Sequence, residues 1–496
     1  MQKLWTPLKE HFQSEIQGKH LKEFLADEAR NKNLVFKHKD IILDLSHEQI
    51  NQKTVKLLQD LGNQSKVFEK IQKQMSGEKI NQTEKRAVLH TALRAPQDAK
   101  EIQVDGINVI SEVHSVQKRI QDFSNRVRKG EFKGFSGKSL QNTVVIGIGG
   151  SYLSIEFVHE ALRSSQQGTE NSKNRQLRFL ANVDPVDFSR AVAGLDPEET
   201  LLVINSKTFT TAETILNAKT VKNWLISHYK NKGLQTETTE QINAICAAHI
   251  SACSTNLKAT NAFGIADENV FGFWDFVGGR YSVWCGIGVL PLSLQYGFEM
   301  VSDFLKGGND MDNHLMEQKE NSLPYLLALI GFYNTSIAGY NARAILPYAQ
   351  SLCKFVPHIQ QLDMESNGKR VSLNGEVLDY ECTVINFGEP GTNGQHSFYQ
   401  LLHQGRVIPC EFIGYIKSQQ PIQVPGEKIP SHLELMSNYF SQPDALALGK
   451  DMDQLKAENV PEELLNHKYF PGNRPSLSLL FKELNAFRLF MGYQFI

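Results

Sequence analysis

The sequence lacks an excess of charge of either sign. Its 52 basic and 54 acidic residues give a formal net charge of −2, so the overall charge favours neither nucleic acid nor an anionic membrane surface as a partner. Cysteine is also scarce. The six cysteines form no Cys-x-x-Cys pair and show no spacing typical of a metal site. We therefore expect no bound metal, and thiols that are buried and reduced.

Long hydrophobic runs are missing as well. The most apolar stretch, residues 323–338, contains a proline, an asparagine and a threonine, so it is too short and too polar to span a membrane. Residues 1–20 lack the apolar segment of a signal peptide. We expect a cytoplasmic protein with no membrane partner. A chain of 496 residues is too long for one ordinary core, which predicts two or three domains.

The pattern of apolar and polar residues changes along the chain. Residues 1–100 are polar and charged with spaced apolar positions, which predicts an N-terminal helical extension. Residues 101–290 alternate short apolar runs with helical stretches, which predicts a doubly wound parallel sheet with ligands beyond the carboxyl ends of the strands. Residues 291–496 repeat this alternation of apolar runs and helical stretches, which predicts a second α/β domain.

Two of the predicted strands end in residues suited to a phosphate. Gly-Ile-Gly-Gly-Ser at 147–151 follows a strand and opens a helix, where backbone N–H groups can meet an anion. Ser-Lys-Thr-Phe-Thr-Thr at 206–211 follows another strand and carries five side-chain donors. Each has an ordinary alternative: a structural glycine turn, and a solvated loop in which Thr210 and Glu213 form a capping box. Because both lie at strand ends, we predict a shared phosphate site.

Three further stretches each present one reactive side chain among glycines and small residues. These are Arg280 after Gly278 and Gly279, Glu365 before a Ser-Asn-Gly turn, and His396 after a glycine-rich loop. Singly, each could be a solvated or ion-paired residue. Together, a fixed cation, a base and a proton shuttle could move a proton next to a carbonyl and stabilise the resulting enediolate.

Taken together, these stretches resemble the glucose-6-phosphate isomerase (phosphoglucose isomerase) family. The resemblance rests on residues 206–211, 275–282, 361–369 and 391–405, with shorter matches at 86–90 and 472–475. It implies two sugar-isomerase (SIS-type) α/β domains and an aldose–ketose isomerase that interconverts glucose 6-phosphate and fructose 6-phosphate. It also implies a homodimer with a shared active site and no cofactor.

The resemblance also implies roles for individual residues. Glu365 would be the base that carries the proton between C2 and C1, and Arg280 would stabilise the cis-enediolate. His396 would reach the site from the neighbouring subunit and assist ring opening, with Glu213 orienting it. Matches to the phosphate-binding positions are Ser151, Ser206, Lys207, Thr208 and Thr211, and matches to positions lining the sugar are Gly150, Gly279 and Gln361.

One departure concerns the end of the chain. The family continues several dozen residues beyond the position of Ile496, and that segment carries a lysine acting at the ring oxygen. Two alternatives to an ordinary enzyme therefore stay open, an incomplete sequence and a catalytically weakened paralogue that only binds sugar phosphates. The residues also leave open another phosphosugar, such as mannose 6-phosphate, as substrate.

Overall fold

The chain folds into two compact units. The computed structural model describes residues 2–234, 236 and 238–493. Unit 1 combines residues 1–71 with 310–496, and unit 2 comprises residues 72–309. The chain leaves unit 1 within helix α5 (Val67–Met75) and returns within α14 (Phe298–Gln318). This division differs from the predicted one, because most of the predicted extension 1–100 belongs to unit 1 and the predicted boundary at 290 lies inside unit 2.

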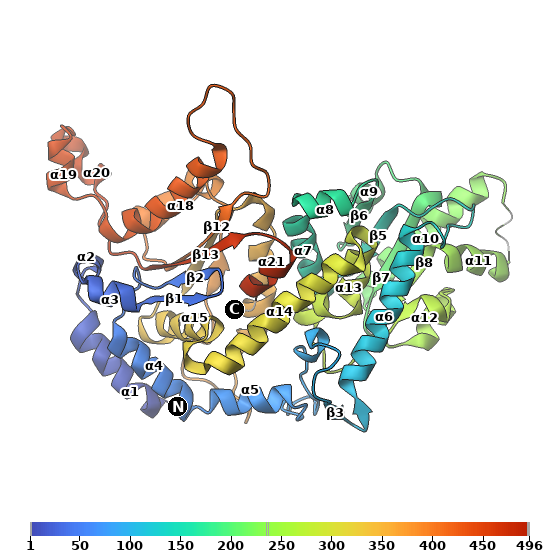
Figure 1. Ribbon diagram of the computed structural model, residues 1–496, viewed down its shortest axis with the longest axis horizontal. Helices are drawn as coiled ribbons and strands as arrows, with labels where there is room; N and C mark the ends of the chain where they lie inside the picture. The colour runs from blue at the N-terminus through green and yellow to red at the C-terminus, as the bar shows by residue number, and fades with distance from the viewer. Residues whose placement is uncertain (1, 235, 237, 494–496) are drawn as a thin grey trace. The chain divides into compact units, whose positions relative to one another are not determined.

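Unit 2 contains a five-stranded parallel sheet (Figure 1). The strand order is β6-β5-β7-β8-β9, with neighbouring strands parallel throughout. The predicted strands at 143–146, 177–183 and 200–204 are confirmed, although β6 is shorter than expected. The strands are β5 (Asn142–Ile146), β6 (Gln176–Leu180), β7 (Thr200–Asn205), β8 (Ile250–Cys253) and β9 (Val270–Phe271).

Helices cover both faces of this sheet. On one face, Val144 and Leu202 pack into a core with residues of α10 and α11. Successive side chains of a strand point to opposite faces, so Val145 and Val203 face the other side, where α13 contacts β5 and packs against α6. The helices and the small hairpin of unit 2 are α6 (Val109–Arg128), α7 (Leu153–Arg163), α8 (Gln166–Asn171), α9 (Pro185–Val192), α10 (Ala212–Asn231), α11 (Thr239–His249), α12 (Leu257–Phe263), α13 (Gly286–Tyr296), β3 (Gln103–Val104) and β4 (Ile107–Asn108).

Unit 1 contains a six-stranded mixed sheet. Its order is β1-β2-β13-β12-β10-β11, in which the four strands from β13 to β11 are parallel and β2 is antiparallel to both its neighbours. Ala344 and Leu346 of β10 and Phe412 of β12 pack against side chains of α17 and α18. The strands are β1 (Val35–His38), β2 (Ile41–Asp44), β10 (Ala342–Pro347), β11 (Ile385–Phe387), β12 (Cys410–Lys417) and β13 (Ser476–Glu483).

The N-terminal region is therefore more than a helical extension. Strands β1 and β2 lie within it, and β2 pairs with β13, for example Ile42 with Leu480. This part of the prediction is wrong because the pairing partner lies more than 400 residues away in the sequence. The helices of unit 1 are α1 (Gln2–His11), α2 (Leu21–Leu25), α3 (Glu28–Asn33), α4 (Gln52–Gln64), α15 (Leu323–Phe332), α16 (Phe355–Ile359), α17 (Tyr399–Gln404), α18 (Ser431–Leu448), α19 (Met452–Ala457), α20 (Leu465–Lys468) and α21 (Ala486–Tyr493).

The two parallel sheets share one strand order. Numbered along the chain, the first four parallel strands of unit 2 and the parallel strands of unit 1 both run 2-1-3-4. A sheet that grows outward in both directions from its first strand is doubly wound. The predicted fold class, two doubly wound α/β domains, is confirmed.

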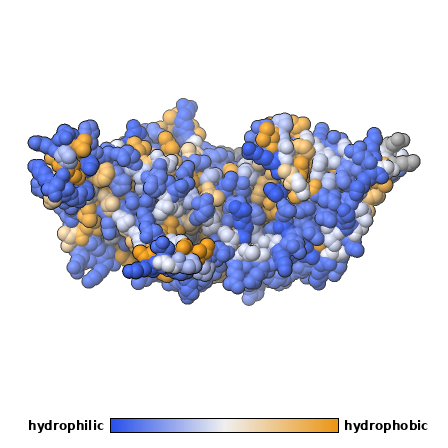
Figure 2. Space-filling view, turned by 90° about the horizontal axis from the view of Figure 1, so that it is seen from above, coloured by the Kyte–Doolittle hydropathy of each residue, from blue (hydrophilic) through white to orange (hydrophobic). Residues whose placement is uncertain are grey.

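The surface and the thiols complete this description. The face drawn in Figure 2 is mostly hydrophilic, with hydrophobic residues in small separate groups. Among the described residues, no helix is both long and apolar enough to cross a membrane. All six cysteines are free thiols, and four of them are buried. The expectation of burial is wrong for Cys382, which is exposed, and only partly right for Cys353.

Candidate active site

The first half of the site lies at the carboxyl edge of the unit 2 sheet. Strand β5 is buried along its whole length, and the chain then turns through Gly149, whose φ of +58° lies in the left-handed region that favours glycine. Helix α7 begins at Leu153 without a side-chain cap. Its first backbone N–H groups are therefore available to an anion.

The Ser206–Thr211 loop follows β7 at the same edge. Two side chains fix the position of the loop, because the carbonyl oxygen of Lys207 accepts hydrogen bonds from Ser254 Oγ (3.1 Å) and Thr255 Oγ1 (2.9 Å). Phe209 is buried in the unit 2 core. Ser206 is 3% exposed, and none of the described residues hydrogen-bonds to its hydroxyl oxygen. A buried hydroxyl without a partner is costly unless a ligand satisfies it, so this loop is suited to an incoming anion.

Helix α10 starts directly after this loop. Its N-cap is Thr211, whose side chain makes no capping hydrogen bond. The alternative of a capping box between Thr210 and Glu213 is therefore wrong; instead the hydroxyls of Thr208 and Thr210 bond to each other at 2.6 Å. A helix of 20 residues presents several unsatisfied N–H groups and a partial positive charge at this end. Glu213 is exposed in its first turn, close to the loop.

The Arg280 turn packs directly on the glycine turn after β5. A Cβ atom added to Gly150 would collide with the carbonyl oxygen of Gly279, so only glycine permits this approach. Ser151 ends the same short 3-10 turn as Gly150. The arrangement brings the guanidinium-bearing segment of Arg280 beside the predicted phosphate-binding turn. Unit 2 thus gathers Gly150, Ser151, the 206–211 loop, Gly279 and Arg280 at one edge of its sheet.

Sequence reasoning missed one neighbour of Arg280. The ring of His90 stacks on the ring of Tyr281, with centroids 4.1 Å apart and planes 4° apart. Burial, and then the positive charges of Arg94 and Arg280, lower the pKa of His90 well below its usual value. His90 therefore stays neutral beside this arginine. It lies within the matched stretch 86–90, which was the one signal that could have singled it out.

Basic side chains meet around Asp275 at this edge. Lys207 Nζ lies 2.9 Å from Asp275 Oδ1, and Arg86 Nη1 donates to the Asp275 carbonyl oxygen at 2.8 Å. The hydrogen bond from Lys207 lowers the pKa of Asp275. The Asp275 side chain is 82% exposed, so water screens this ion pair. Lys207 can therefore exchange the carboxylate for a phosphate at modest cost.

The remaining predicted site residues lie in unit 1. Gln361 and Glu365 occupy a π-helical turn, η10 (Gln360–Glu365), that continues α16. Glu365 is exposed, and its Oε2 accepts a hydrogen bond from Ser366 Oγ at 2.8 Å. Within the part of the chain that is described, no residue bonds to Gln361 Oε1. Both side chains thus offer oxygen atoms from one helical turn.

Glu365 and His396 lie at opposite edges of the unit 1 sheet. Asp363, two residues before Glu365, contacts Arg343, the second residue of β10, so Glu365 lies near the amino ends of the strands. His396 is exposed at the end of the turn η11 (Asn393–His396), which follows the carboxyl end of β11. That loop is tied to the carboxyl end of β10, since Gly391 N–H donates to the Pro347 carbonyl oxygen at 3.0 Å. Glu365 therefore does not follow a carboxyl strand end, whereas the glycine turn and the 206–211 loop of unit 2 do.

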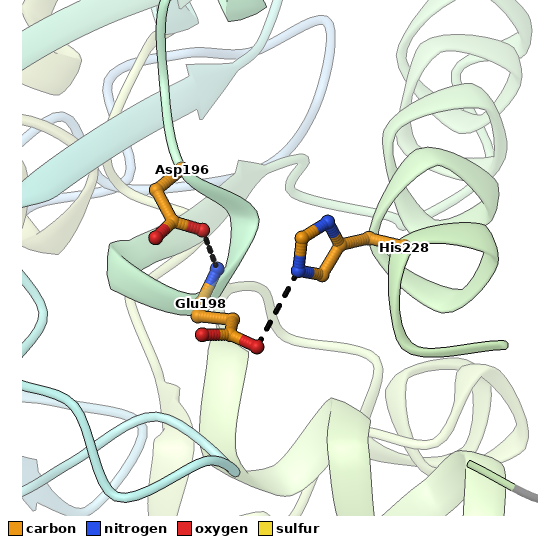
Figure 3. A group of neighbouring side chains, drawn as sticks. All are labelled: Asp196, Glu198 and His228. Atoms are coloured by element: carbon orange, nitrogen blue, oxygen red, sulfur yellow. Dashed lines mark hydrogen bonds and ion pairs between the residues drawn. The ribbon is translucent and has the colours of Figure 1, made fainter. Parts of the chain in front are cut away.

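A separate cluster of ionisable groups lies at the amino edge of the unit 2 sheet. Ligand atoms of Asp196, Glu198 and His228 lie within 4.8 Å of one another, a spacing that could hold a metal ion (Figure 3). However, Lys138 Nζ already bridges Asp196 and Glu198 at 2.7 and 2.8 Å, and Lys232 Nζ contacts Glu198 at 2.7 Å. The hydrogen bond from Lys138, followed by that from Lys232, lowers the pKa of Glu198 to about 2. The cluster is thus an ion-pair network with its own cations.

Comparisons with known proteins identify the family. The profile of the phosphoglucose isomerase family matches residues 44–492. The chain belongs to this family. It is similar to the cytosolic glucose-6-phosphate isomerase of Zea mays, with 53% identity over 98% of this chain and 83% of the relative. It is similar to the cytosolic enzyme of Arabidopsis thaliana, with 52% identity over 98% of this chain and 84% of the relative.

A solved structure supports the same assignment. The fold is similar to that of a glucose-6-phosphate isomerase from Chlamydia trachomatis, with a TM-score of 0.85 and 28% identity. The match covers 99% of this chain and 89% of the other. The similarity therefore extends over both units.

Proposed function

We propose that this chain is a glucose-6-phosphate isomerase, which interconverts glucose 6-phosphate and fructose 6-phosphate. Family membership and relatives with more than 50% identity support this reaction. The observation that carries the proposal is the anion site at the carboxyl edge of unit 2, where the Ser206 hydroxyl has no hydrogen-bond partner among the described residues and Thr211 leaves the start of α10 uncapped. By analogy with its relatives named cytosolic, the enzyme acts in the cytosol.

The reaction requires one proton to move between neighbouring carbons. Glu365 takes the proton from C2 of the open-chain aldose, and the electrons of that C–H bond form the C1–C2 double bond while the C1 carbonyl becomes the enediolate oxygen. The same carboxylic acid then returns the proton to C1, while the C2 hydroxyl gives up its proton to become the ketone and the C1 oxygen takes that proton up as an alcohol. Arg280 stabilises the enediolate by its fixed positive charge. No redox cofactor is needed, because the substrate carbons exchange oxidation state with each other.

The other site residues divide by function. His396 assists ring opening as an acid–base group, and Glu213 orients its imidazole. The phosphate is held by Ser151, Ser206, Lys207, Thr208 and Thr211, and the sugar is lined by Gly150, Gly279 and Gln361. The hydroxyls, the ammonium and the helix N-terminus match the acceptor oxygens and the charge of a phosphate monoester.

We propose further that the enzyme is a homodimer that shares its active sites. Glu365 and His396 lie at opposite edges of one sheet, separated by strands such as β10 with six residues, or roughly 20 Å. One hexose cannot contact both within this sheet, so His396 serves a second copy. In unit 2, exposed apolar side chains gather at the same edge as the anion site and offer a surface for that copy: Ile148, Val183, Val186 and Leu216.

The test is an isomerase assay on the purified chain with fructose 6-phosphate. Glu365→Gln should lower turnover by about 10²–10⁴-fold with little change in sugar-phosphate binding, because a general base is lost. The matched control is Glu376→Gln, which changes an exposed glutamate in the segment that follows. Exchange of the C2 proton with solvent at the wild-type rate in Glu365→Gln would remove Glu365 from the mechanism.

A further inference from the structure

The turn that carries Glu365 needs support from elsewhere in unit 1. It is the last turn of η10, and the next strand begins only at Ile385. Two contacts of Glu365 are local and exposed: Ser366 Oγ donates to its carboxylate at 2.8 Å, and Lys369 Nζ donates to its carbonyl oxygen at 2.6 Å. Exposed contacts of this kind are weak constraints. By themselves, these two contacts do not hold a base within the fraction of an ångström that proton transfer requires.

Asp363, two residues before Glu365, makes stronger contacts. Its Oδ2 accepts hydrogen bonds from Asn386 Nδ2 at 2.7 Å and from Arg343 Nη2 at 3.3 Å. Its Oδ1 accepts a hydrogen bond from Asn367 Nδ2 at 2.8 Å. The side chains of Asp363 and Arg343 are each 14% exposed. Both oxygens of this carboxylate are therefore held, in a site that is largely closed to water.

Arg343 joins this contact to the sheet. Its Nε donates to Asn386 Oδ1 at 2.8 Å, and its Nη1 donates to Glu411 Oε1 at 3.0 Å. Arg343 lies on β10, Asn386 on β11 and Glu411 on β12, which are neighbouring strands. The guanidinium group is planar and fixes the direction of each of its hydrogen bonds. The side chains of three strands thus fix the position of Asp363, and Asn386 itself is 1% exposed.

A second link points the same way. Gln360 Nε2, from the first residue of η10, donates to the Asn386 carbonyl oxygen at 3.0 Å. The turn is therefore held at both its first residue and its fourth, and both contacts involve Asn386. Charge-assisted hydrogen bonds in a site of low water content are stronger and more rigid than exposed ones.

We propose that Asp363, Asn386 and Arg343 are positioning residues that hold the Glu365 carboxylate where it can transfer the proton. The inference rests on the proposed function of Glu365 as the base. A misplacement of about 1 Å costs proton transfer on the order of 10²-fold in rate. None of the three residues touches substrate in this proposal. They act by fixing the path of the backbone that leads to Glu365.

The surroundings allow these residues to be changed without crowding. Arg343, Asp363 and Asn367 line a cavity of about 410 Å³ in unit 1, together with Glu411 and other polar and apolar side chains. Water can enter such a space when a polar group is removed. Asp363→Ala therefore frees the turn without forcing a collapse of the core. Asp363→Asn retains the shape and one oxygen, so it should have a smaller effect.

The test separates positioning from general stability by isotope effects. In Asp363→Ala we expect kcat to fall about 10–100-fold, while KM for glucose 6-phosphate changes by less than about 3-fold, because the phosphate site lies in unit 2. The primary deuterium isotope effect on kcat with C2-deuterated substrate should rise, since proton transfer becomes slower than the other steps. Asn386→Leu should give the same pattern, and Asp363→Asn an intermediate one.

The matched control is Asp40→Asn. Asp40 accepts a hydrogen bond from Arg488 Nε at 2.7 Å, which is another aspartate–arginine pair of unit 1, beside β2 rather than β11. It should leave kcat, KM and the isotope effect unchanged. A fall in kcat of Asp363→Ala with an unchanged isotope effect would mean a smaller active fraction and would overturn the proposal. An unchanged kcat would also overturn it.

The proposal and the function on which it rests fail differently. If Glu365→Gln retains full turnover, the assignment of the base is wrong. If Glu365→Gln is inactive but Asp363→Ala and Asn386→Leu behave as wild type, the base stands and the positioning role is wrong. Thermal unfolding of each variant, followed by circular dichroism, reports whether the fold is retained.

Discussion

At the scale of single residues, the anion site is defined by groups that the fold leaves unsatisfied. Ser206 is almost fully buried, yet its hydroxyl has no partner among the described residues. Thr211 begins a long helix without capping it. Native proteins satisfy nearly all buried polar groups, so the Ser206 hydroxyl suits a ligand, and the exposed start of α10 beside it can offer backbone N–H groups to the same ligand. Lys207 adds a charge whose ion-pair partner, the Asp275 carboxylate, is exposed.

Removing these donors should weaken binding more than chemistry. We expect Lys207→Ala combined with Thr211→Ala to raise KM for fructose 6-phosphate by about 10-fold or more, because hydrogen bonds to charged groups contribute roughly 1.5–3 kcal/mol each. The inhibition constant of inorganic phosphate should rise in parallel. The control is Lys230→Ala, which removes a lysine near the other end of α10. Competition by phosphate with unaltered affinity in the double variant would place the anion site elsewhere.

At the scale of elements, buried strands were predictable and their long-range partners were not. Strands β5 and β7 are short β-branched runs that end in glycine or polar turns, so local pattern was sufficient to find them. The run Ile41-Ile42-Leu43 carried the same signal. The surrounding residues are charged and have a helix-like pattern, and the partner strand β13 lies at the other end of the chain. Sequence spacing contains no information about such pairings.

The candidate site likewise contains residues whose position could be predicted from the sequence and residues whose position could not. The loop at 206–211 follows directly from β7, so its place at the carboxyl edge could be predicted from chain order. The place of Glu365 could not, because α16 and η10 run back along the sheet and end near the amino edge. The hydrogen-bonded cluster of Asp363, Arg343 and Asn386 joins residues up to 43 positions apart in the sequence. Asp363 lies in the matched stretch 361–369, whereas Arg343 and Asn386 lie in none of the matched stretches.

One buried carboxyl group of unit 1 makes the free energy of unfolding depend on pH. Glu48, which follows β2, is 1% exposed, and burial raises its pKa to about 8, opposed by a hydrogen bond from Asn334 and aided by the charge of Glu411. An unfolded glutamate has a pKa of about 4.3. The native state therefore holds a proton that the unfolded state releases, and the free energy of unfolding falls as pH rises between these two values.

Glu48→Gln should remove this decrease in the free energy of unfolding with rising pH. The amide keeps the shape and stays neutral, so we expect the variant to be more stable than wild type at pH 8 by about 1–3 kcal/mol, with a smaller difference at pH 5. Thermal midpoints measured from pH 5 to pH 8.5 give the comparison. Glu381→Gln, at an exposed position of the same unit, should follow the wild-type curve. A gap between Glu48→Gln and wild type that does not widen with pH would contradict a buried, protonated carboxyl group.

At the scale of the whole molecule, the arrangement within unit 1 supports the proposed sharing of active sites between two copies of the chain. The proposed base and the proposed ring-opening histidine come from the same sheet but from opposite edges of it. A single copy of this sheet cannot apply both to one hexose. Two copies can, if each contributes Glu365 to one site and His396 to the other.

Mixed dimers test this arrangement directly. A dimer of one Glu365→Gln subunit and one His396→Ala subunit should have about half the wild-type activity, because one of its two sites combines the intact Glu365 of one subunit with the intact His396 of the other. If His396 acted in its own subunit, each site would lack one group and activity would stay near that of the single variants. The reciprocal control joins a wild-type subunit to a Glu365→Gln/His396→Ala subunit. If the sites are shared, that dimer has no intact site, whereas if His396 acts within its own subunit, the dimer is half active. The two mixed dimers must therefore give opposite results. Dimers isolated with two different affinity tags allow both to be measured by the same fructose 6-phosphate assay.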